Sequence, residues 1–176
     1  MAINNIVDES FIINQKKLKQ FGDRCSNVKI GIMGGTFDPI HYAHLATAEF
    51  IRDNYKLDKI LFIPSGNPPH KKGNITDKYD RYNMVLLSTV NNDDFIVSDI
   101  EIKREKSTYT IDTLKVLKQI YKNAEIYFIT GADAICDIET WKDVEGNFKL
   151  ANFIAATRPG ISLLRANEKI KELKDK

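Results

Sequence analysis

Short, nearly unbroken apolar runs alternate along the chain with longer stretches in which apolar residues recur at helical spacing. The apolar runs, which predict strands, lie at residues 28–33, 59–63, 95–98, 125–130 and 153–157. The amphipathic stretches, which predict helices, lie at residues 41–55, 77–90 and 110–121. Near-continuous apolar strands that alternate with helices are typical of a parallel sheet covered on both faces. The pattern therefore predicts an α/β fold, a Rossmann-like doubly wound parallel sheet with helices on both faces.

The segments outside this alternation have simpler predictions. Residues 1–27 precede the first strong strand, and Ser10 is placed to cap a short surface helix within them. Residues 64–76 hold three prolines and two glycines, which predicts a loop. A charged helix is expected from Ser162 onward. We expect a single domain over residues 1–176, with residues 1–27 as an N-terminal extension.

Composition and charge indicate which classes of binding partner and which cellular compartment to expect. A formal net charge of +2 in 176 residues leaves no footprint of general nucleic-acid binding, which requires a strong basic excess. No apolar run approaches the length of a membrane span, and no apolar signal core opens the chain. Cys25 and Cys136 lie far apart without CxxC spacing, which favours a reducing compartment over a disulfide framework. We therefore expect a cytoplasmic protein without nucleic-acid or membrane partners, and the sequence leaves a homo-oligomer open.

The most informative motif follows the first predicted strand and reads Gly-Gly-Thr-Phe-Asp-Pro-Ile-His-Tyr-Ala-His over residues 34–44. In parallel sheets ligands bind beyond the carboxyl ends of the strands, and glycines let backbone N–H groups approach such a ligand closely. His41 and His44 fall on one face of the first helical turn, whose N-terminus suits anions. The motif therefore predicts a polyphosphate cradle with two imidazoles that stabilise charge on a transferring phosphorus centre. Helix capping or surface placement of the two histidines stays the alternative.

This motif differs from other phosphate and metal motifs. It lacks the Gly-Lys-Ser/Thr ending of a Walker A loop, and it lacks the G-x-G-x-x-G dinucleotide fingerprint. The histidine pair lacks the glutamate of H-E-x-x-H, and no third ligand of matching type is evident. No metal site built from protein side chains is therefore predicted.

Three further strand ends carry polar motifs. His70 and Lys71 lie in the proline-rich loop after the second strand, where a phosphate contact competes with a solvated basic loop. Gly131 and Asp133 follow the fourth strand, where the carboxylate could accept from a ribose hydroxyl or cap a helix. Arg158 follows the last strand and suits either bidentate phosphate binding or plain surface exposure.

Two more features point to a ligand. Ser107, Thr108, Tyr109 and Thr110 open the cleanest amphipathic helix. One of these hydroxyls is expected to cap the helix, and the surplus hydroxyls could bind a ligand carboxylate. Trp141 is the only tryptophan and stands in polar surroundings, which favours stacking on a heteroaromatic ligand over a purely structural role.

Together these motifs resemble those of the bacterial nicotinate-nucleotide adenylyltransferases, over about residues 29–160. The superfamily signature G-x-F-D-P-x-H-x-G-H is matched by residues 35–44, with Ala43 where the family usually has glycine. More specific likeness is carried by residues 63–71, 109–113, 131–133, 140–142 and 158–160. Several specific motifs in the family's order make chance similarity implausible.

The resemblance implies transfer of the adenylyl group of ATP to nicotinate mononucleotide, which gives nicotinate adenine dinucleotide and pyrophosphate in NAD biosynthesis. It implies that His41 and His44 are catalytic, and that Mg²⁺ bridges the ATP phosphates without a dedicated protein site. The ATP-binding residues that it implies are Gly34, Gly35, Thr36, Phe37, His41, His44, Gly131 and Asp133. The substrate-binding residues that it implies are His70, Lys71, Tyr109, Thr110, Trp141 and Arg158.

The likeness fails near the C-terminus. The family's signature I-S-[S/A]-T-x-I-R, whose helix N-terminus and arginine grip the triphosphate, has only a faint echo at residues 161–165. We therefore expect the C-terminal part of the family fold to be missing from this chain. Two other functions stay open: a catalytically weak nucleotide-binding protein of the same family, and another cytidylyl- or adenylyltransferase such as a phosphopantetheine adenylyltransferase.

Overall fold

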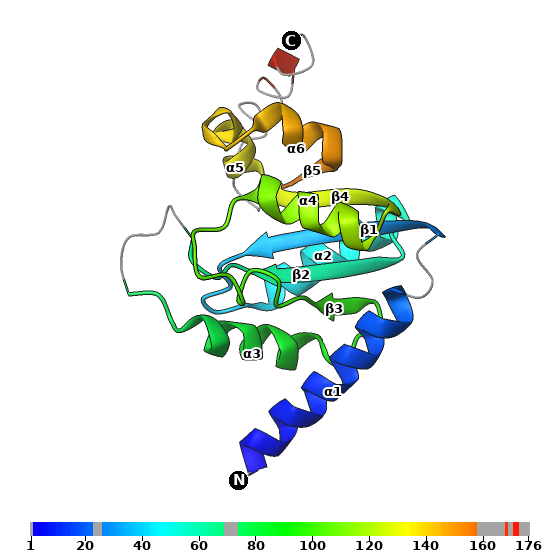
Figure 1. The fold of residues 1–176 in the computed structure, drawn as a ribbon, viewed down its shortest axis with the longest axis vertical. Helices are drawn as coiled ribbons and strands as arrows, with labels where there is room; N and C mark the ends of the chain where they lie inside the picture. Colours follow the sequence, from blue (N-terminus) through cyan, green and yellow to red (C-terminus); the bar gives the residue numbers. More distant parts are fainter. Residues whose placement is uncertain (1, 23–25, 69–73, 158–167, 169–170, 173–176) are drawn as a thin grey trace.

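A computed structural model describes residues 2–22, 26–68, 74–157, 168 and 171–172 (Figure 1). Its centre is a parallel sheet of five strands in the order β3-β2-β1-β4-β5. The strands are β1 (Ser26–Gly35), β2 (Lys59–Pro64), β3 (Phe95–Val97), β4 (Asn123–Gly131) and β5 (Asn152–Ala156). The helices are α1 (Ala2–Gly22), α2 (Tyr42–Tyr55), α3 (Lys78–Thr89), α4 (Thr110–Ile120), α5 (Ala132–Cys136), η1 (Ile138–Thr140) and α6 (Val144–Leu150). In the part of the chain that the structure describes, no helix is long and apolar enough to cross a membrane.

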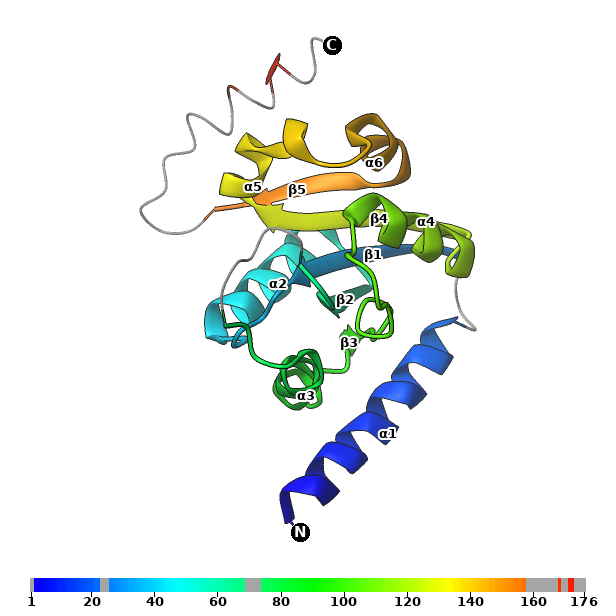
Figure 2. The same ribbon diagram turned by 60° about the vertical axis from the view of Figure 1, so that its left-hand side comes forward.

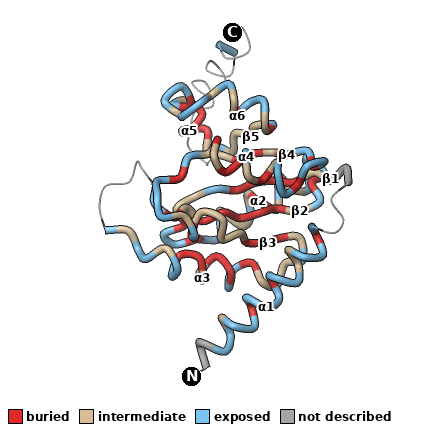
Figure 3. Tube along the Cα trace, viewed as in Figure 1, coloured by how far each residue is buried: buried red, intermediate tan, exposed pale blue. Residues whose placement is uncertain are grey.

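The two faces of the sheet bury separate apolar clusters, because side chains alternate along each strand. On β2, Ile60 and Phe62 join the cluster under α2 and α3, whereas Leu61 and Ile63 join the cluster under α4. Figures 1 and 2 show the sheet between these helices, and Figure 3 shows that buried residues concentrate in the strands and the inward faces of the helices. The structure confirms the predicted doubly wound sheet with helices on both faces.

The five predicted strands and three predicted helices are all present, with small shifts at their ends. One other prediction is wrong. Ser10 does not cap a helix, because α1 continues through it and buries it within its inward face. The structure also has α5, η1 and α6 between the last two strands, which the sequence pattern did not resolve. These helices are five, three and seven residues long, too short for a helical period to repeat. The charged helix predicted from Ser162 falls almost entirely outside the described residues.

Helix α1 lies along the edge of the sheet formed by β3 and projects beyond it at its N-terminal end (Figure 2). The side chain of Asn14 pairs with the backbone of Val97 in both directions. Its amide nitrogen donates to the carbonyl of Val97 over 2.9 Å, and its oxygen accepts from the N–H of Val97 over 2.8 Å. A carboxamide therefore takes the place that a neighbouring strand would have on this edge. Lys17 adds a second attachment, because its ammonium donates to the carbonyls of Val90 and Asn92.

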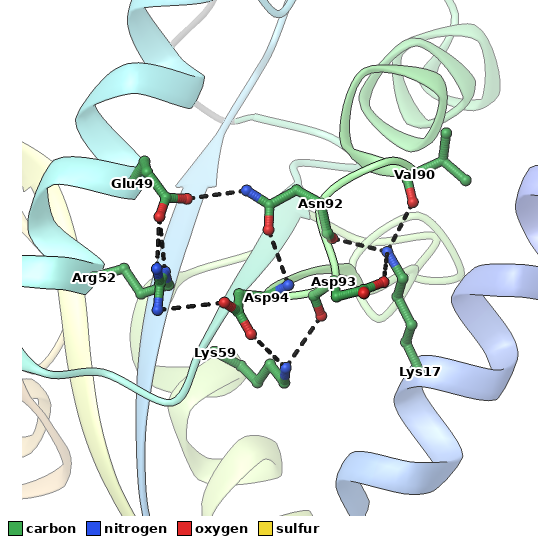
Figure 4. Close-up of polar contacts among 8 residues, drawn as sticks. All are labelled: Lys17, Glu49, Arg52, Lys59, Val90, Asn92, Asp93 and Asp94. Atoms are coloured by element: carbon green, nitrogen blue, oxygen red, sulfur yellow. Dashed lines mark hydrogen bonds and ion pairs between the residues drawn. The ribbon is translucent and has the colours of Figure 1, made fainter.

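A network of charged and polar side chains lies at the amino ends of β2 and β3 (Figure 4). Arg52, near the end of α2, contacts Glu49 at 2.6 Å and Asp94 at 3.3 Å. Lys59, at the start of β2, contacts the same Asp94 at 2.6 Å. Asn92 donates to Glu49 over 2.9 Å. The network ties α2 to the turn before β3, at the opposite end of the sheet from the glycine-bearing strand ends.

The pairing of Asn14 with β3 yields a prediction for stability. Asn14→Ala leaves the buried N–H and C=O of Val97 without partners, so the free energy of unfolding should fall by about 1–3 kcal/mol. Urea unfolding of the variant and the wild type measures this loss. Asn5→Ala is the matched control, because Asn5 is an exposed asparagine of the same helix. Equal stability of the two variants would contradict the role given to Asn14.

Candidate active site

A cavity of about 400 Å³ opens at the carboxyl ends of β1, β4 and β5. The strand order changes direction here, because β2 and β3 extend the sheet on one side of β1 and β4 and β5 extend it on the other. Ligands of open α/β sheets bind at such a position. All of the predicted ATP-binding residues except Asp133 line the cavity: Gly34, Gly35, Thr36, Phe37, His41, His44 and Gly131. Ala43, which replaces the family's glycine, also lines it.

His41 and His44 lie together at the start of α2. Their ring centroids are 3.8 Å apart, and the ring planes differ by 30°. His41 is the N-cap residue, and its backbone N–H donates to Nδ1 of His44 over 3.3 Å. A neutral His44 therefore carries its proton on Nε2, which makes that nitrogen a donor. The pair serves the start of the helix and also lines the cavity, so the two interpretations of these histidines are compatible.

Phe37 has a left-handed backbone with φ of 50°, and its side chain is buried. Its ring lies 3.2 Å from the position that a Cβ on Gly35 would take, so a larger residue there would crowd the ring. The ring also meets that of His44 edge-on, with 5.2 Å between centroids. A backbone of this kind costs about 1–3 kcal/mol and persists where its surroundings hold it in place. The side chain of Phe37 therefore serves the core, and its backbone is the part available to a ligand.

Arg81 is a site residue that the sequence analysis missed. It is 1 % exposed within α3, and its guanidinium donates to carbonyls of the loops that follow β1 and β2. Burial lowers the pKa of Arg81, while the charges of Asp38 and Asp77 raise it. One signal was available, because position 81 falls on the buried helical stripe that contains Tyr82 and Val85. A charged residue on an apolar stripe indicates a buried polar partner.

A second cavity, of about 550 Å³, lies beside the start of α4. Tyr109, Thr110 and Trp141, all predicted to bind substrate, line it together with Lys142. Trp141 packs edge-on against Phe128 at 6.0 Å and is partly buried. Its ring therefore belongs to the core and to the cavity wall at once. Lys142 lies 4.7 Å from the ring centroid of Tyr109, a cation–π distance.

The hydroxyl cap expected at the start of α4 is absent, so that prediction is wrong. Tyr109 is the N-cap residue, and its side chain makes no capping hydrogen bond. The hydroxyls of Thr108 and Thr113 instead donate to the carboxylate of Glu101, over 2.9 and 2.7 Å. Burial raises the pKa of Glu101, while the hydrogen bonds from both threonines and the charge of Arg104 lower it. The start of α4 is thus held by the half-buried carboxylate of Glu101, which the sequence analysis also missed.

The remaining predicted residues are placed as follows. Asp133 is exposed in the first turn of α5, and Gly131 is the N-cap residue, so the interpretation of Asp133 as a cap is wrong. His70, Lys71 and Arg158 lie outside the described residues. Over the ranges that the structure covers, no group of three His, Cys, Asp or Glu side chains could hold a metal ion.

Comparisons with known proteins agree on one family. Residues 32–175 match the cytidylyltransferase-like family, and α1 precedes this stretch. Two relatives are each named "probable nicotinate-nucleotide adenylyltransferase". The relative from Thermoanaerobacter sp. strain X514 is 54% identical over 84% of this chain and 71% of its own length. The relative from Desulfitobacterium hafniense strain Y51 is 51% identical over 81% and 70%.

Solved structures show the same fold. A Plasmodium falciparum nicotinic acid mononucleotide adenylyltransferase, solved in complex with NaAD, matches with a TM-score of 0.62 and 24% identity. The match covers 85% of this chain and 90% of that one. At this identity the likeness is one of fold.

The half-buried carboxyl of Glu101 yields a prediction for pH dependence. The folded protein keeps this proton at pH values where the unfolded chain has released it, so stability falls as pH rises from about the ordinary value of 4.5. Glu101→Gln is neutral at every pH, and its free energy of unfolding should fall less steeply over this window. Urea unfolding at a series of pH values tests this. Glu105→Gln, at an exposed position nearby, is the control and should keep the wild-type slope. A wild-type slope in Glu101→Gln would refute the burial effect.

Proposed function

Because this chain belongs to the cytidylyltransferase-like family, among the nicotinate-nucleotide adenylyltransferases, we propose that it transfers the adenylyl group of ATP to nicotinate mononucleotide. The products are nicotinate adenine dinucleotide and pyrophosphate. The observation that carries the proposal is the cavity at the change of strand direction, where two glycines, His41 and His44 meet. A helix N-terminus, a glycine-bearing strand end and imidazoles together suit a polyphosphate.

The reaction needs little covalent chemistry from the protein. An oxygen of the mononucleotide phosphate attacks the α-phosphorus of ATP and forms the new P–O bond. The bond from that phosphorus to the bridging oxygen breaks, and pyrophosphate leaves with the electron pair. The attacking phosphate is already ionised, so no general base is required. Catalysis then consists of positioning and of stabilising the charge that develops on the phosphates.

His44 and His41 are proposed to hold the ATP phosphates. Nε2 of His44 is a donor when the ring is neutral, because Nδ1 accepts from the backbone of His41. The backbone of Gly34 to Phe37 faces the same cavity and adds N–H donors. Gly131 also lines this cavity, and Asp133, in the first turn of α5, is proposed to accept from a ribose hydroxyl.

The second cavity is proposed to take the pyridine end of the mononucleotide. Trp141 would stack on the pyridine ring, and Tyr109 and Thr110 would meet the carboxylate at the start of α4. Their place in one cavity wall supports this assignment. His70, Lys71 and Arg158 complete the proposed substrate site on the strength of their sequence motifs.

The remaining parts of the proposal concern Mg²⁺, the cellular compartment and the oligomeric state. Asp38 is the one carboxylate among the described residues that line the first cavity, which fits a Mg²⁺ ion bound mainly by phosphate oxygens. When bound, that ion neutralises charge on the triphosphate. We propose a single domain that works in the cytoplasm, where its nucleotide substrates are available, and a homo-oligomer is compatible with every contact described.

Pyrophosphate release with ATP and Mg²⁺ tests the function, with nicotinate and nicotinamide mononucleotide compared as acceptors. Turnover should favour the acid by about 10- to 100-fold, the effect of one hydrogen bond to a charged group worth about 1.5–3 kcal/mol. Folded protein that binds mononucleotide without turnover would instead indicate a nucleotide-binding relic. Turnover only with another phosphorylated acceptor, such as phosphopantetheine, would indicate a different transferase.

His44 provides the sharpest test of the proposed roles. His44→Ala should lower kcat by at least about 10²-fold, because it removes a donor aimed at charge that develops in the transition state. The same pyrophosphate assay measures the loss. Tyr42→Ala is the control, because Tyr42 is 85 % exposed in the same helical turn and should leave kcat unchanged. A near-wild-type rate for His44→Ala would rule out the role.

A further inference from the structure

One buried side chain joins the two loops that follow β1 and β2 at the carboxyl edge of the sheet. The guanidinium of Arg81 donates to the carbonyl of Thr36 over 2.6 Å, which fixes the loop after β1. It donates to the carbonyls of Ser65 and Gly66 over 2.7 and 3.1 Å, which fixes the loop after β2. Its Nε donates to the carbonyl of Thr76 over 2.9 Å, just before α3. The rigid planar fork of arginine holds its acceptors in a fixed geometry, which the flexible stem of a lysine does not provide.

These bonds also set the direction of backbone donors. In a trans peptide the C=O and the following N–H point in opposite directions. A carbonyl of Thr36 that faces Arg81 therefore turns the N–H of Phe37 away from the guanidinium. The carbonyl of Gly66 does the same for the N–H of Asn67. Thr36 and Phe37 line the first cavity, so Arg81 controls the orientation of a peptide group in its wall.

The loop after β2 connects Arg81 to the second cavity through a chain of contacts. A Cβ on Gly66 would collide with the carbonyl oxygen of Glu101, so the two backbones are in close contact. Glu101 in turn accepts from Thr108 and Thr113 at the start of α4, where the second cavity lies. A continuous line of contacts thus runs from Thr36 through Arg81 to α4.

Stability alone gives little reason for this arrangement. Taking a guanidinium out of water is costly, and an apolar side chain of similar volume often stabilises a core equally well. The acceptors described for Arg81 are backbone carbonyls, and the most distant of them, that of Thr36, lies 45 residues away in the sequence. What the arginine adds is a fixed spatial relation among the segments that carry these carbonyls.

We propose that Arg81 is a positioning residue that couples the two nucleotide sites, so that occupation of one cavity favours binding in the other. The inference rests on the proposed function for the identity of the two ligands. Arg81 touches neither ligand in this view. It acts by holding the loop of Thr36 and the loop of Ser65 in the relation that aligns the two reacting phosphates.

The test compares wild type with Arg81→Lys, which keeps the charge, and Arg81→Met, which keeps most of the volume. Calorimetry measures the affinity for nicotinate mononucleotide with and without α,β-methylene ATP, a non-reacting analogue. In the wild type the analogue should tighten mononucleotide binding by at least about fivefold, the lower range of ordinary coupling. In either variant that folds, this factor should approach one. The kcat should fall at least about tenfold, with a smaller change in either KM.

Arg52→Lys is the matched control, because Arg52 joins helix and loop by polar contacts at the opposite end of the sheet. It should lose stability without losing coupling or kcat. Coupling and kcat that survive in Arg81→Lys or Arg81→Met would overturn the proposal, as would wild-type protein that binds both nucleotides independently. Wild-type protein without pyrophosphate release would count against the proposed function only, because the binding measurement needs no turnover.

Discussion

Parallel pairing of β1 with both β2 and β4 is the constraint on which the rest of the structure depends. The register sets Gly35 opposite Pro64 and Met33 opposite Ile129, so the three strands end at nearly the same level. Loops that are distant in sequence therefore leave the sheet side by side. Since the chain builds the sheet outward from β1 in both directions, no crossing helix fills the space between the ends of β1 and β4. The candidate active site is a direct result of this topology.

The long elements of the fold were predictable because their patterns repeat. Helix α4 shows several turns of one apolar stripe, and each central strand is apolar on both faces. Prediction of helix starts failed where tertiary contacts outweighed the local capping preference of a residue. Ser10 is a good capping residue, yet α1 runs through it because that face of the helix is buried against the body. Tyr109 is a poor cap, yet α4 begins there because Glu101 anchors its neighbours.

The residues of the candidate site also fall into those that the sequence predicts and those that only the fold reveals. His41 and His44 were predictable because their motif is local and places both rings on one turn. Arg81 and Glu101 were not predictable, because their partners are carbonyls and hydroxyls brought near by the fold.

The two ends of the sheet also use charge differently. Half-exposed ion pairs such as that of Lys59 with Asp94 tie elements together at one end. At the other end Arg81, which is buried, and Glu101, which is half-buried, hold neighbouring loops and a helix start through hydrogen bonds to carbonyls and hydroxyls.

The attachment of α1 to the sheet has a consequence for how the chain is made. Helix α1 leaves the ribosome before the sheet, yet the backbone groups that hold Asn14 belong to Val97, synthesised 83 residues later. Most of the stability of a helix in a protein comes from packing of its apolar face, so α1 gains little until that strand is in place. The N-terminal segment must therefore wait while β1, β2 and β3 emerge and pair. A helix that is translated before the sheet is thus among the last elements to reach its final position.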